Sequence, residues 1–287
     1  MTEVKLGAAT VQRIEESYEP NFDAKMFFPD WQPAVVQEHR DWLLPNHYDE
    51  PSGSLKLSVH SWLLTVGGKR ILIDTCVGNH KSRPHRPKWH LMETPYLARL
   101  KAAGVEPDQV DMVMCTHLHV DHVGWNTRLE NGRWVPTFPK ARYVFGKNEF
   151  DYWTEQNAKT PVPPFADSVL PVVEAKLAEV VRDDYAIGDH TRILPTPGHT
   201  PGHVAFTFGR NKDDAVFSGD LMHSPLQTRY PELSAKFDVD QAQAATTRRQ
   251  FMERYCDSDT LCCTAHFPSP SVGKIRRHGN GFSCEAI

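Results

Sequence analysis

Short apolar runs closed by turn residues alternate along this chain with segments of helical spacing. The first such run, residues 55–64, is rich in β-branched and aromatic side chains and is predicted to be a strand. The Gly67-Gly68 pair then turns the chain into a second apolar run at residues 70–73. These two runs predict successive strands at the start of the protein core.

Further strands and helices follow in two batches. Thr94 is in position to cap a helix over residues 96–103, which Gly104 would end. The same patterns predict strands at residues 110–115, 141–145, 192–194, 203–208, 215–217 and 260–264, and helices at 149–156, 168–181 and 239–255. Two batches of strands, each followed by helices, predict a layered α/β architecture with the chemistry at one sheet edge.

Residues 1–55 differ from the rest of the chain. They are rich in aromatic residues and proline and show no clear periodicity. We interpret them as an N-terminal extension over a core. A length of 287 residues allows one large domain or two small ones, and we predict that residues 1–287 form a single domain.

Charge and composition exclude several classes of protein. The formal net charge of −4 lacks the basic excess with which nucleic-acid binders neutralise phosphates. No 18 apolar residues run together, and the N-terminus carries no apolar signal segment. The six cysteines form no CxxC pair, which is typical of reduced thiols. We therefore expect a cytoplasmic protein with no nucleic-acid or membrane partner.

The candidate chemistry lies in the histidines, of which the chain has 15. Residues 116–122 read Thr-His-Leu-His-Val-Asp-His. Residues two apart in an extended segment point the same way, so His117 and His119 can face one point beyond a strand end. Asp121 and His122 would project from the first turn of a following helix toward a neighbouring point. Two such pairs suit two adjacent zinc or similar divalent ions.

Two closed metal sites need more ligands than this run supplies. The loop at residues 197–203 is rich in glycine and proline and can present His199 rigidly. Asp220 follows an apolar strand and can bridge two ions, and His266 ends the last predicted strand. The predicted ligands are His117, His119 and His199 for one ion, Asp121, His122 and His266 for the other, and Asp220 shared by both.

With its ligands in this order, the sequence resembles the metallo-β-lactamase superfamily. The His-x-His-x-Asp-His run carries the resemblance, and Asp74 resembles the aspartate that supports the metal site in that family. The resemblance spans roughly residues 57–267. It implies an α/β fold, an αβ/βα four-layer sandwich with a dinuclear metal site at one edge. Zinc is the expected metal, although manganese, cobalt and iron accept the same ligands.

Two ions sharing a water would supply a metal-bridging hydroxide at neutral pH, which would attack a carbonyl or phosphoryl centre. A leaving alkoxide would then bind metal or take a proton from Asp121 or His223. His223 stands about where the acyl-homoserine lactonases of this superfamily carry a tyrosine, and its role can be catalytic or purely structural. The candidate catalytic residues are Asp121, Asp220 and His223. His203 begins a strand and is expected to be structural or to support the ligands.

The resemblance also narrows the substrate class. The aspartate bridge argues against a true β-lactamase, and the short tail after His266 argues against the helical domain of glyoxalase II. What is left resembles the acyl-homoserine lactonases and the methyl-parathion-hydrolase-like enzymes. We expect a hydrolase that opens a lactone or cleaves a carboxylic ester of a small molecule, with phosphotriester hydrolysis as the alternative. Aromatic residues expected to line the pocket or to pack in the core are Phe27, Phe28, Trp31, Trp125 and Trp153.

Two alternatives from other classes stay open at this point. A mononuclear iron dioxygenase of the superfamily would retain most of the histidine run, and a non-catalytic binding module would be expected to lose ligands. Oligomeric state is also open, although relatives with such an extension often form homodimers. The expected partner is a small-molecule substrate.

Overall fold

The computed structural model describes residues 3–287. The chain forms two compact units: a first unit with the residues up to Ser17 and Val59–Tyr185, and a second unit with Tyr18–Ser58 and Ala186–Ile287. Every helix within residues 3–287 is too short or too polar to cross a bilayer.

An eight-stranded sheet organises the first unit, and its long strands β2 and β4 continue into residues of the second. The strand order is β1-β2-β4-β5-β6-β9-β10, and β3 pairs with β4 off this path. Strands β5, β6, β9 and β10 run parallel to one another. Their bounds are β1 Glu3–Leu6, β2 Ala9–Asp23, β3 Tyr48–Asp49, β4 Ser54–Val66, β5 Lys69–Ile73, β6 Met112–Cys115, β9 Arg142–Gly146 and β10 Ala178–Val181.

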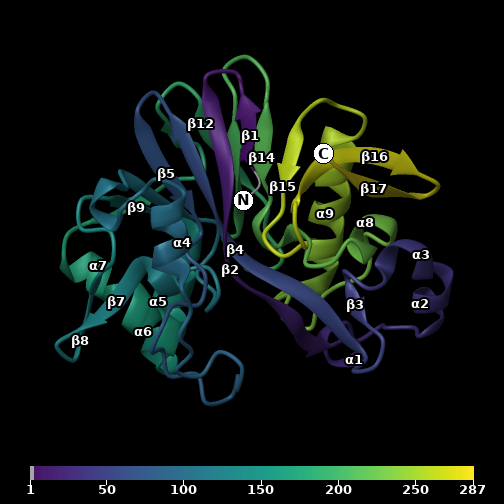
Figure 1. Cartoon of the computed structure of the whole chain (residues 1–287), viewed down its shortest axis with the longest axis horizontal. Helices are drawn as coiled ribbons and strands as arrows, with labels where there is room; N and C mark the ends of the chain where they lie inside the picture. The colour runs from purple at the N-terminus through teal and green to yellow at the C-terminus, as the bar shows by residue number, and fades with distance from the viewer. Residues whose placement is uncertain (1–2) are drawn as a thin grey trace. The chain divides into compact units, whose positions relative to one another are not determined.

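Helices and a small hairpin complete the first unit (Figure 1, blue to teal). The central strands β5 and β6 are buried along most of their length, as expected for parallel strands covered on both faces. Helix α5 packs against β9 and β10. The remaining elements are α4 Tyr96–Ala102, η1 Pro107–Gln109, η2 Gly124–Asn126, β7 Thr127–Glu130, β8 Arg133–Pro136, α5 Lys147–Lys159, α6 Pro163–Ser168 and α7 Leu170–Glu174.

A seven-stranded sheet organises the second unit, in the sequential order β11-β12-β13-β14-β15-β16-β17. Only β14 and β15 pair in parallel; the other neighbours are antiparallel. The strands are β11 Ala186–Ile187, β12 Thr191–Pro195, β13 Val204–Phe208, β14 Ala215–Phe217, β15 Leu261–Cys263, β16 Val272–His278 and β17 Gly281–Ala286. The helices are α1 Ala24–Phe27, α2 Ala34–Glu38, α3 Arg40–Leu43, η3 Gly219–Leu221, α8 Leu226–Arg229 and α9 Gln241–Tyr255.

Helix α9 packs against β16 and supplies much of the core of this unit (Figure 1). Its residues Phe251, Met252 and Tyr255 lie in one buried cluster with Val216 and Ile275 from the sheet. A second buried cluster joins Phe27, Phe28 and Trp31 to the rest of the helical segment 24–43 and to α8. The aromatic residues of the N-terminal segment are therefore mostly core.

Several elements differ from the sequence-based predictions. The helix predicted at residues 168–181 is confirmed only for α7, which ends at Glu174; its last part is wrong, because residues 178–181 form the parallel strand β10. Thr94 does not cap α4, since its hydroxyl faces Asn79 and Glu16 instead. Residues 3–23 form β1 and β2, and residues 272–286 form the β16–β17 hairpin, none of which the sequence pattern predicted.

Candidate metal centre

The parallel strands β5 and β6 end at the same edge of their sheet and bring Asp74 beside Thr116. The Asp74 carboxylate accepts hydrogen bonds from the backbone N–H of Thr116 at 2.8 Å and from its hydroxyl at 2.9 Å. Its Oδ2 also lies 2.9 Å from Nδ1 of His122. A histidine that donates Nδ1–H to a carboxylate keeps its Nε2 for a metal ion. The predicted hydrogen bond between Asp74 and a histidine of the run is thus confirmed.

The histidine run itself is a compact turn. The helix predicted around Asp121 and His122 is wrong, because the backbone of this segment bonds to the loop after β5. The N–H of Thr75 donates to the carbonyl of His122 at 2.7 Å, and Gly124 donates to Cys76 at 2.7 Å. A Cβ atom at Gly124 would lie 1.7 Å from the Val77 carbonyl oxygen, so only glycine fits this close approach.

Within the turn, three imidazole rings lie together. The ring centroid of His117 is 4.6 Å from that of His119 and 4.1 Å from that of His122. Nε2 of His117 lies 3.0 Å from Nδ1 of His119, and Asp121 Oδ1 lies 4.0 Å from Nε2 of His122. His117 and His122 are buried, and His119 is partly exposed. The first unit therefore gathers the predicted ligands of residues 117–122 into one group.

A buried carboxylate that sequence reasoning missed supports this turn. Glu149, in the first turn of α5, accepts from the N–H of Leu118 at 2.9 Å and from Nε1 of Trp153 at 2.7 Å. The Trp153 ring in turn packs edge-on against His119 at 5.4 Å. An acidic residue at a helix start is so common that the sequence offered no specific signal for this role.

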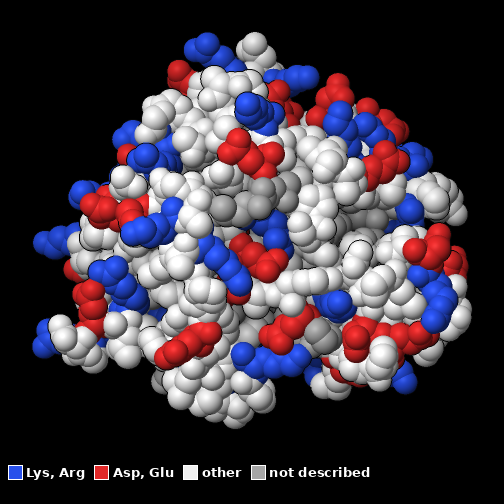
Figure 2. Space-filling view, viewed as in Figure 1, with Lys and Arg blue, Asp and Glu red and all other residues white. Residues whose placement is uncertain are grey.

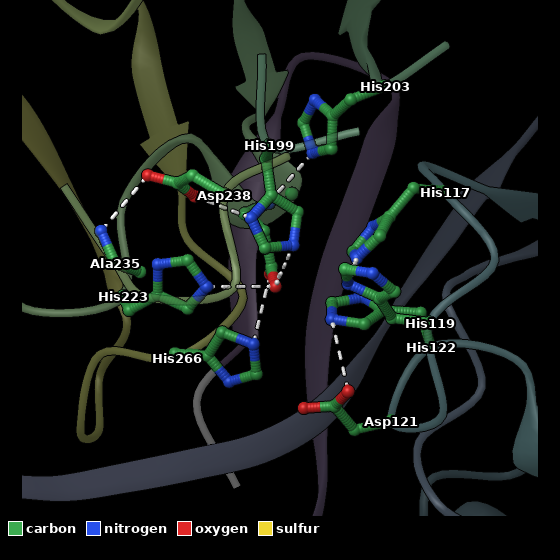
Figure 3. A network of polar contacts seen from close by, with 12 residues as sticks. His117, His119, Asp121, His122, His199, His203, His223, Ala235, Asp238 and His266 are labelled. Atoms are coloured by element: carbon green, nitrogen blue, oxygen red, sulfur yellow. Dashed lines mark hydrogen bonds and ion pairs between the residues drawn. The ribbon is translucent and has the colours of Figure 1, made fainter. Parts of the chain in front are cut away.

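In the second unit, three imidazoles surround one carboxylate. Asp220 Oδ2 lies 3.2 Å from Nε2 of His199 and 3.0 Å from Nε2 of His223, and its Oδ1 lies 2.9 Å from Nε2 of His266. All four side chains are buried. The rings of the three histidines converge in Figure 3. Ligand atoms of Asp220, His223 and His266 all lie within 4.8 Å of one another.

The outer nitrogens of two of these rings have fixed partners. His266 Nδ1 lies 2.8 Å from the backbone carbonyl of Ser58, and His199 Nδ1 lies 2.7 Å from Asp238 Oδ1. A carbonyl oxygen only accepts, so His266 carries a proton on Nδ1. Its neutral form then presents the Nε2 lone pair to the Asp220 carboxylate. The lone pairs of His266 Nε2 and Asp220 Oδ1, 2.9 Å apart, repel each other unless a cation or a second proton lies between them. These imidazole and carboxylate groups therefore fit a divalent ion.

The pKa values of His199 and His223 are shifted in opposite directions. Burial lowers the pKa of His199, but hydrogen bonds with Asp220 and Asp238 outweigh burial and raise that pKa to about 9. For His223, burial outweighs the attraction of Asp220, and its pKa lies below the ordinary value. A metal ion that binds His199 must displace a proton at neutral pH, so metal affinity there is coupled to pH.

The loop that carries His199 is anchored to the start of α9. A Cβ atom at Gly198 would lie 2.3 Å from the Ala244 backbone nitrogen, so the loop requires glycine at this point. His203 accepts from the N–H of Asp220 through Nε2 at 2.9 Å, and its Nδ1 lies 2.8 Å from the Thr196 hydroxyl. As predicted, His203 supports the ligand segment from the loop.

Two of the five aromatic residues predicted for a pocket lie beside these groups. Trp153 contacts His119, and the Phe27 ring lies 5.1 Å from the His223 ring. The other three are buried in the core: Phe28 and Trp31 in the second unit and Trp125 in the first.

Comparison with known proteins identifies the family. Residues 55–266 match the family model of the metallo-beta-lactamase superfamily. The N-acyl homoserine lactonase of Bacillus cereus is 27% identical over 180 residues, which are 58% of this chain and 64% of that protein. A lactonase of a Bacillus species is 29% identical over 117 residues, 41% of this chain and 40% of that protein. The chain therefore spans less than two thirds of the length of these relatives.

Two solved structures share the fold over nearly the whole chain. One, described as hydrolase AbOPH in the beta lactamase superfamily, superposes with a TM-score of 0.83 at 23% identity and covers 99% of this chain and 96% of that one. The other is AidC, a dizinc quorum-quenching lactonase in complex with a product, with a TM-score of 0.81 at 21% identity, covering 100% and 97%. The chain belongs to the metallo-β-lactamase superfamily and has the metallo-β-lactamase fold, with mixed α/β sheets.

Proposed function

We propose that this chain is a metal-dependent hydrolase that opens a lactone or cleaves a carboxylic ester of a small molecule. The observation that carries the proposal is the buried Asp220 carboxylate, which lies beside the Nε2 atoms of three histidines. One of these, His266, already donates its Nδ1 proton to the Ser58 carbonyl, so its Nε2 is left to bind a metal ion. Family membership and relatives named as lactonases support the same reaction class.

The proposed centre is dinuclear and uses the residues that the sequence predicted. Divalent ions in such a site supply Lewis acidity and lower the pKa of water. Zinc suits the imidazole and carboxylate ligands, and manganese, cobalt and iron accept them as well. The proposed ligands are His117, His119 and His199 for one ion, Asp121, His122 and His266 for the other, and Asp220 for both.

The chain's own residues would orient the ligands and move a proton. Asp74 and Asp238 hold the rings of His122 and His199 through Nδ1. We propose that Asp121 or His223 delivers a proton to the leaving alkoxide. The lowered pKa of His223 leaves its ring neutral at pH 7, and the proton that it offers is then the Nε2–H that faces Asp220, since its Nδ1 is buried without a hydrogen-bond partner among the described residues.

A small uncharged ester or lactone fits the charge of the surface better than a nucleic acid does. On the face shown in Figure 2, basic side chains lie among acidic ones rather than in a basic patch. The formal net charge of −4 agrees with this distribution. A cytoplasmic location and a homodimer stay predictions from the sequence.

A hydrolysis screen with metal-reconstituted protein tests the proposal. Acyl-homoserine lactones, simple lactones, aryl esters and phosphotriesters would be compared at equal concentration, before and after removal of metal with a chelator. We expect lactone or carboxylic-ester turnover that the chelator abolishes. Turnover of phosphotriesters alone would refute the lactone or ester assignment and identify the chain as a phosphotriester hydrolase. One iron per chain with consumption of oxygen would instead identify a dioxygenase and refute the hydrolase.

A further inference from the structure

A buried arginine lies beneath the ligand segments of the second unit. Arg248, on α9, is only 1% exposed. Its Nε donates to the carbonyl of Leu221 at 2.6 Å, and its Nη1 donates to the carbonyls of Pro231 at 2.6 Å and Leu233 at 3.1 Å. Its Nη2 lies 3.4 Å from Oδ2 of Asp238. One guanidinium thus joins three backbone carbonyls to one carboxylate.

The Asp238 carboxylate has partners on both oxygens. Oδ1 lies 2.7 Å from Nδ1 of His199, and Oδ2 accepts from the N–H of Ala235 at 3.0 Å in addition to facing Arg248. Figure 3 shows Asp238 between Ala235 and His199. With both oxygens engaged and the side chain fully buried, the carboxylate has little freedom to rotate.

We infer that Asp238 and Arg248 form a positioning pair for the proposed metal ligands of the second unit, an inference that rests on the proposed function. Asp238 accepts the Nδ1 proton of His199 and leaves Nε2 as the ligand atom. Arg248 fixes Asp238 and also holds the carbonyl of Leu221, the residue after Asp220. The pair therefore links the His199 loop to the η3 turn that carries Asp220.

Stability alone does not account for this pair. Withdrawing both charges from water is costly, and well-packed apolar residues often replace a buried ion pair without loss of stability. Apolar residues, however, cannot accept the ring proton of His199 or donate a hydrogen bond to the Leu221 carbonyl. The specific contribution of the pair is thus the orientation of two ligand segments.

The neighbouring pair on the same helix offers a matched control. Arg249 lies 3.4 Å from Glu232, the same separation as Arg248 from Asp238. The side chains of this control pair are exposed, however, 45% for Arg249 and 68% for Glu232. It touches neither ligand segment through any hydrogen bond described for it. Asp238→Asn and Arg248→Met are therefore compared with Glu232→Gln and Arg249→Met.

The main readout is metal affinity, measured by competition with a chelator. We expect Asp238→Asn and Arg248→Met to bind zinc about 10- to 100-fold more weakly than the wild-type chain, whereas both control variants bind like the wild type. Thermal unfolding of the metal-free proteins separates a loss of ligand orientation from a loss of fold. Wild-type affinity in a folded Asp238→Asn variant would overturn the inference.

A measurement on the wild-type chain keeps the inference testable if Arg248→Met fails to fold. In the zinc-loaded protein, the Nδ1 proton of His199 should give a slowly exchanging NMR resonance that Asp238→Asn loses or shifts. A His199 ring protonated on Nε2 in the loaded wild type would refute the inference. A wild-type chain that takes up no metal would instead refute the proposed function, so the two failures are distinguishable.

Discussion

Asp220 offers both carboxylate oxygens to the imidazoles of the second unit. Its contacts of 2.9 to 3.2 Å involve three histidines, two of which were predicted as metal ligands and one as a proton donor. Replacing the carboxylate removes the group that these rings share. Asp220→Ala is therefore expected to abolish turnover and to lower the metal content measured by elemental analysis. Asp213→Ala, at a carboxylate bonded to Tyr255, is the control. Full activity of the Asp220 variant would refute the two-metal mechanism.

The proposed role of His223 as a proton donor can be tested independently of metal binding. A glutamine at this position keeps a hydrogen-bond donor near Asp220 but cannot release a proton. For His223→Gln we expect kcat to fall about 10²- to 10⁴-fold, the range of general acid–base catalysis, with the metal content unchanged. The exposed His278 gives the control variant His278→Gln, which should behave as wild type. Loss of one ion from the His223 variant would show instead that this ring is a ligand.

At the level of elements, the histidine turn depends on one close backbone approach. Gly124 donates to the carbonyl of Cys76, and its Cα faces the Val77 carbonyl with no space for a side chain. Gly124→Ala is expected to lower the free energy of unfolding by about 2 kcal/mol or more, because the strands β5 and β6 that flank the turn resist the required shift. Denaturant unfolding of the metal-free protein measures this change.

Gly132, in the turn between β7 and β8, provides the comparison. A Cβ atom there would meet nothing within 4 Å, so Gly132→Ala would cost only the strain of its positive φ of 76°, about 1 kcal/mol. Equal losses in the two variants would show that the close approach of Gly124 does not constrain the turn.

For the molecule as a whole, the sequence predicted the layered α/β architecture, because buried strands appear in the sequence as apolar runs separated by turn residues. It predicted the family because the His-x-His-x-Asp-His run is contiguous. It failed where tertiary contacts decide local structure. The apolar spacing of β10 continues that of α7 and therefore predicts a helix, and β2 carries polar residues such as Glu16 whose partners lie far away in sequence. Asp238 and Glu149 were missed because their neighbours His199 and Leu118 are 39 and 31 residues away.

Glu16 on β2 is another residue with distant partners, and it couples the stability of the molecule to pH. It accepts from the N–H groups of Val77 and Gly78 and from Nε1 of Trp125. Burial raises its pKa from the ordinary 4.5 to about 7, although these hydrogen bonds act in the opposite direction. The folded state therefore binds this proton more tightly than the unfolded state. The stabilisation is fully present below pH 4.5 and is lost as the pH rises to about 7.

This shift predicts a loss of about 3 kcal/mol of unfolding free energy across that pH window from Glu16 alone, at roughly 1.4 kcal/mol per pH unit. Glu16→Gln removes the ionisation, so its unfolding free energy should fall less steeply with pH than that of the wild type. Denaturant unfolding of both metal-free proteins from about pH 4 to about pH 8, which brackets the two pKa values, measures the two slopes. Glu15→Gln, at the neighbouring carboxyl that is 33% exposed and paired with Arg13, should keep the wild-type slope. Parallel curves for wild type and Glu16→Gln would mean that the donors around Glu16 hold its carboxylate ionised despite burial.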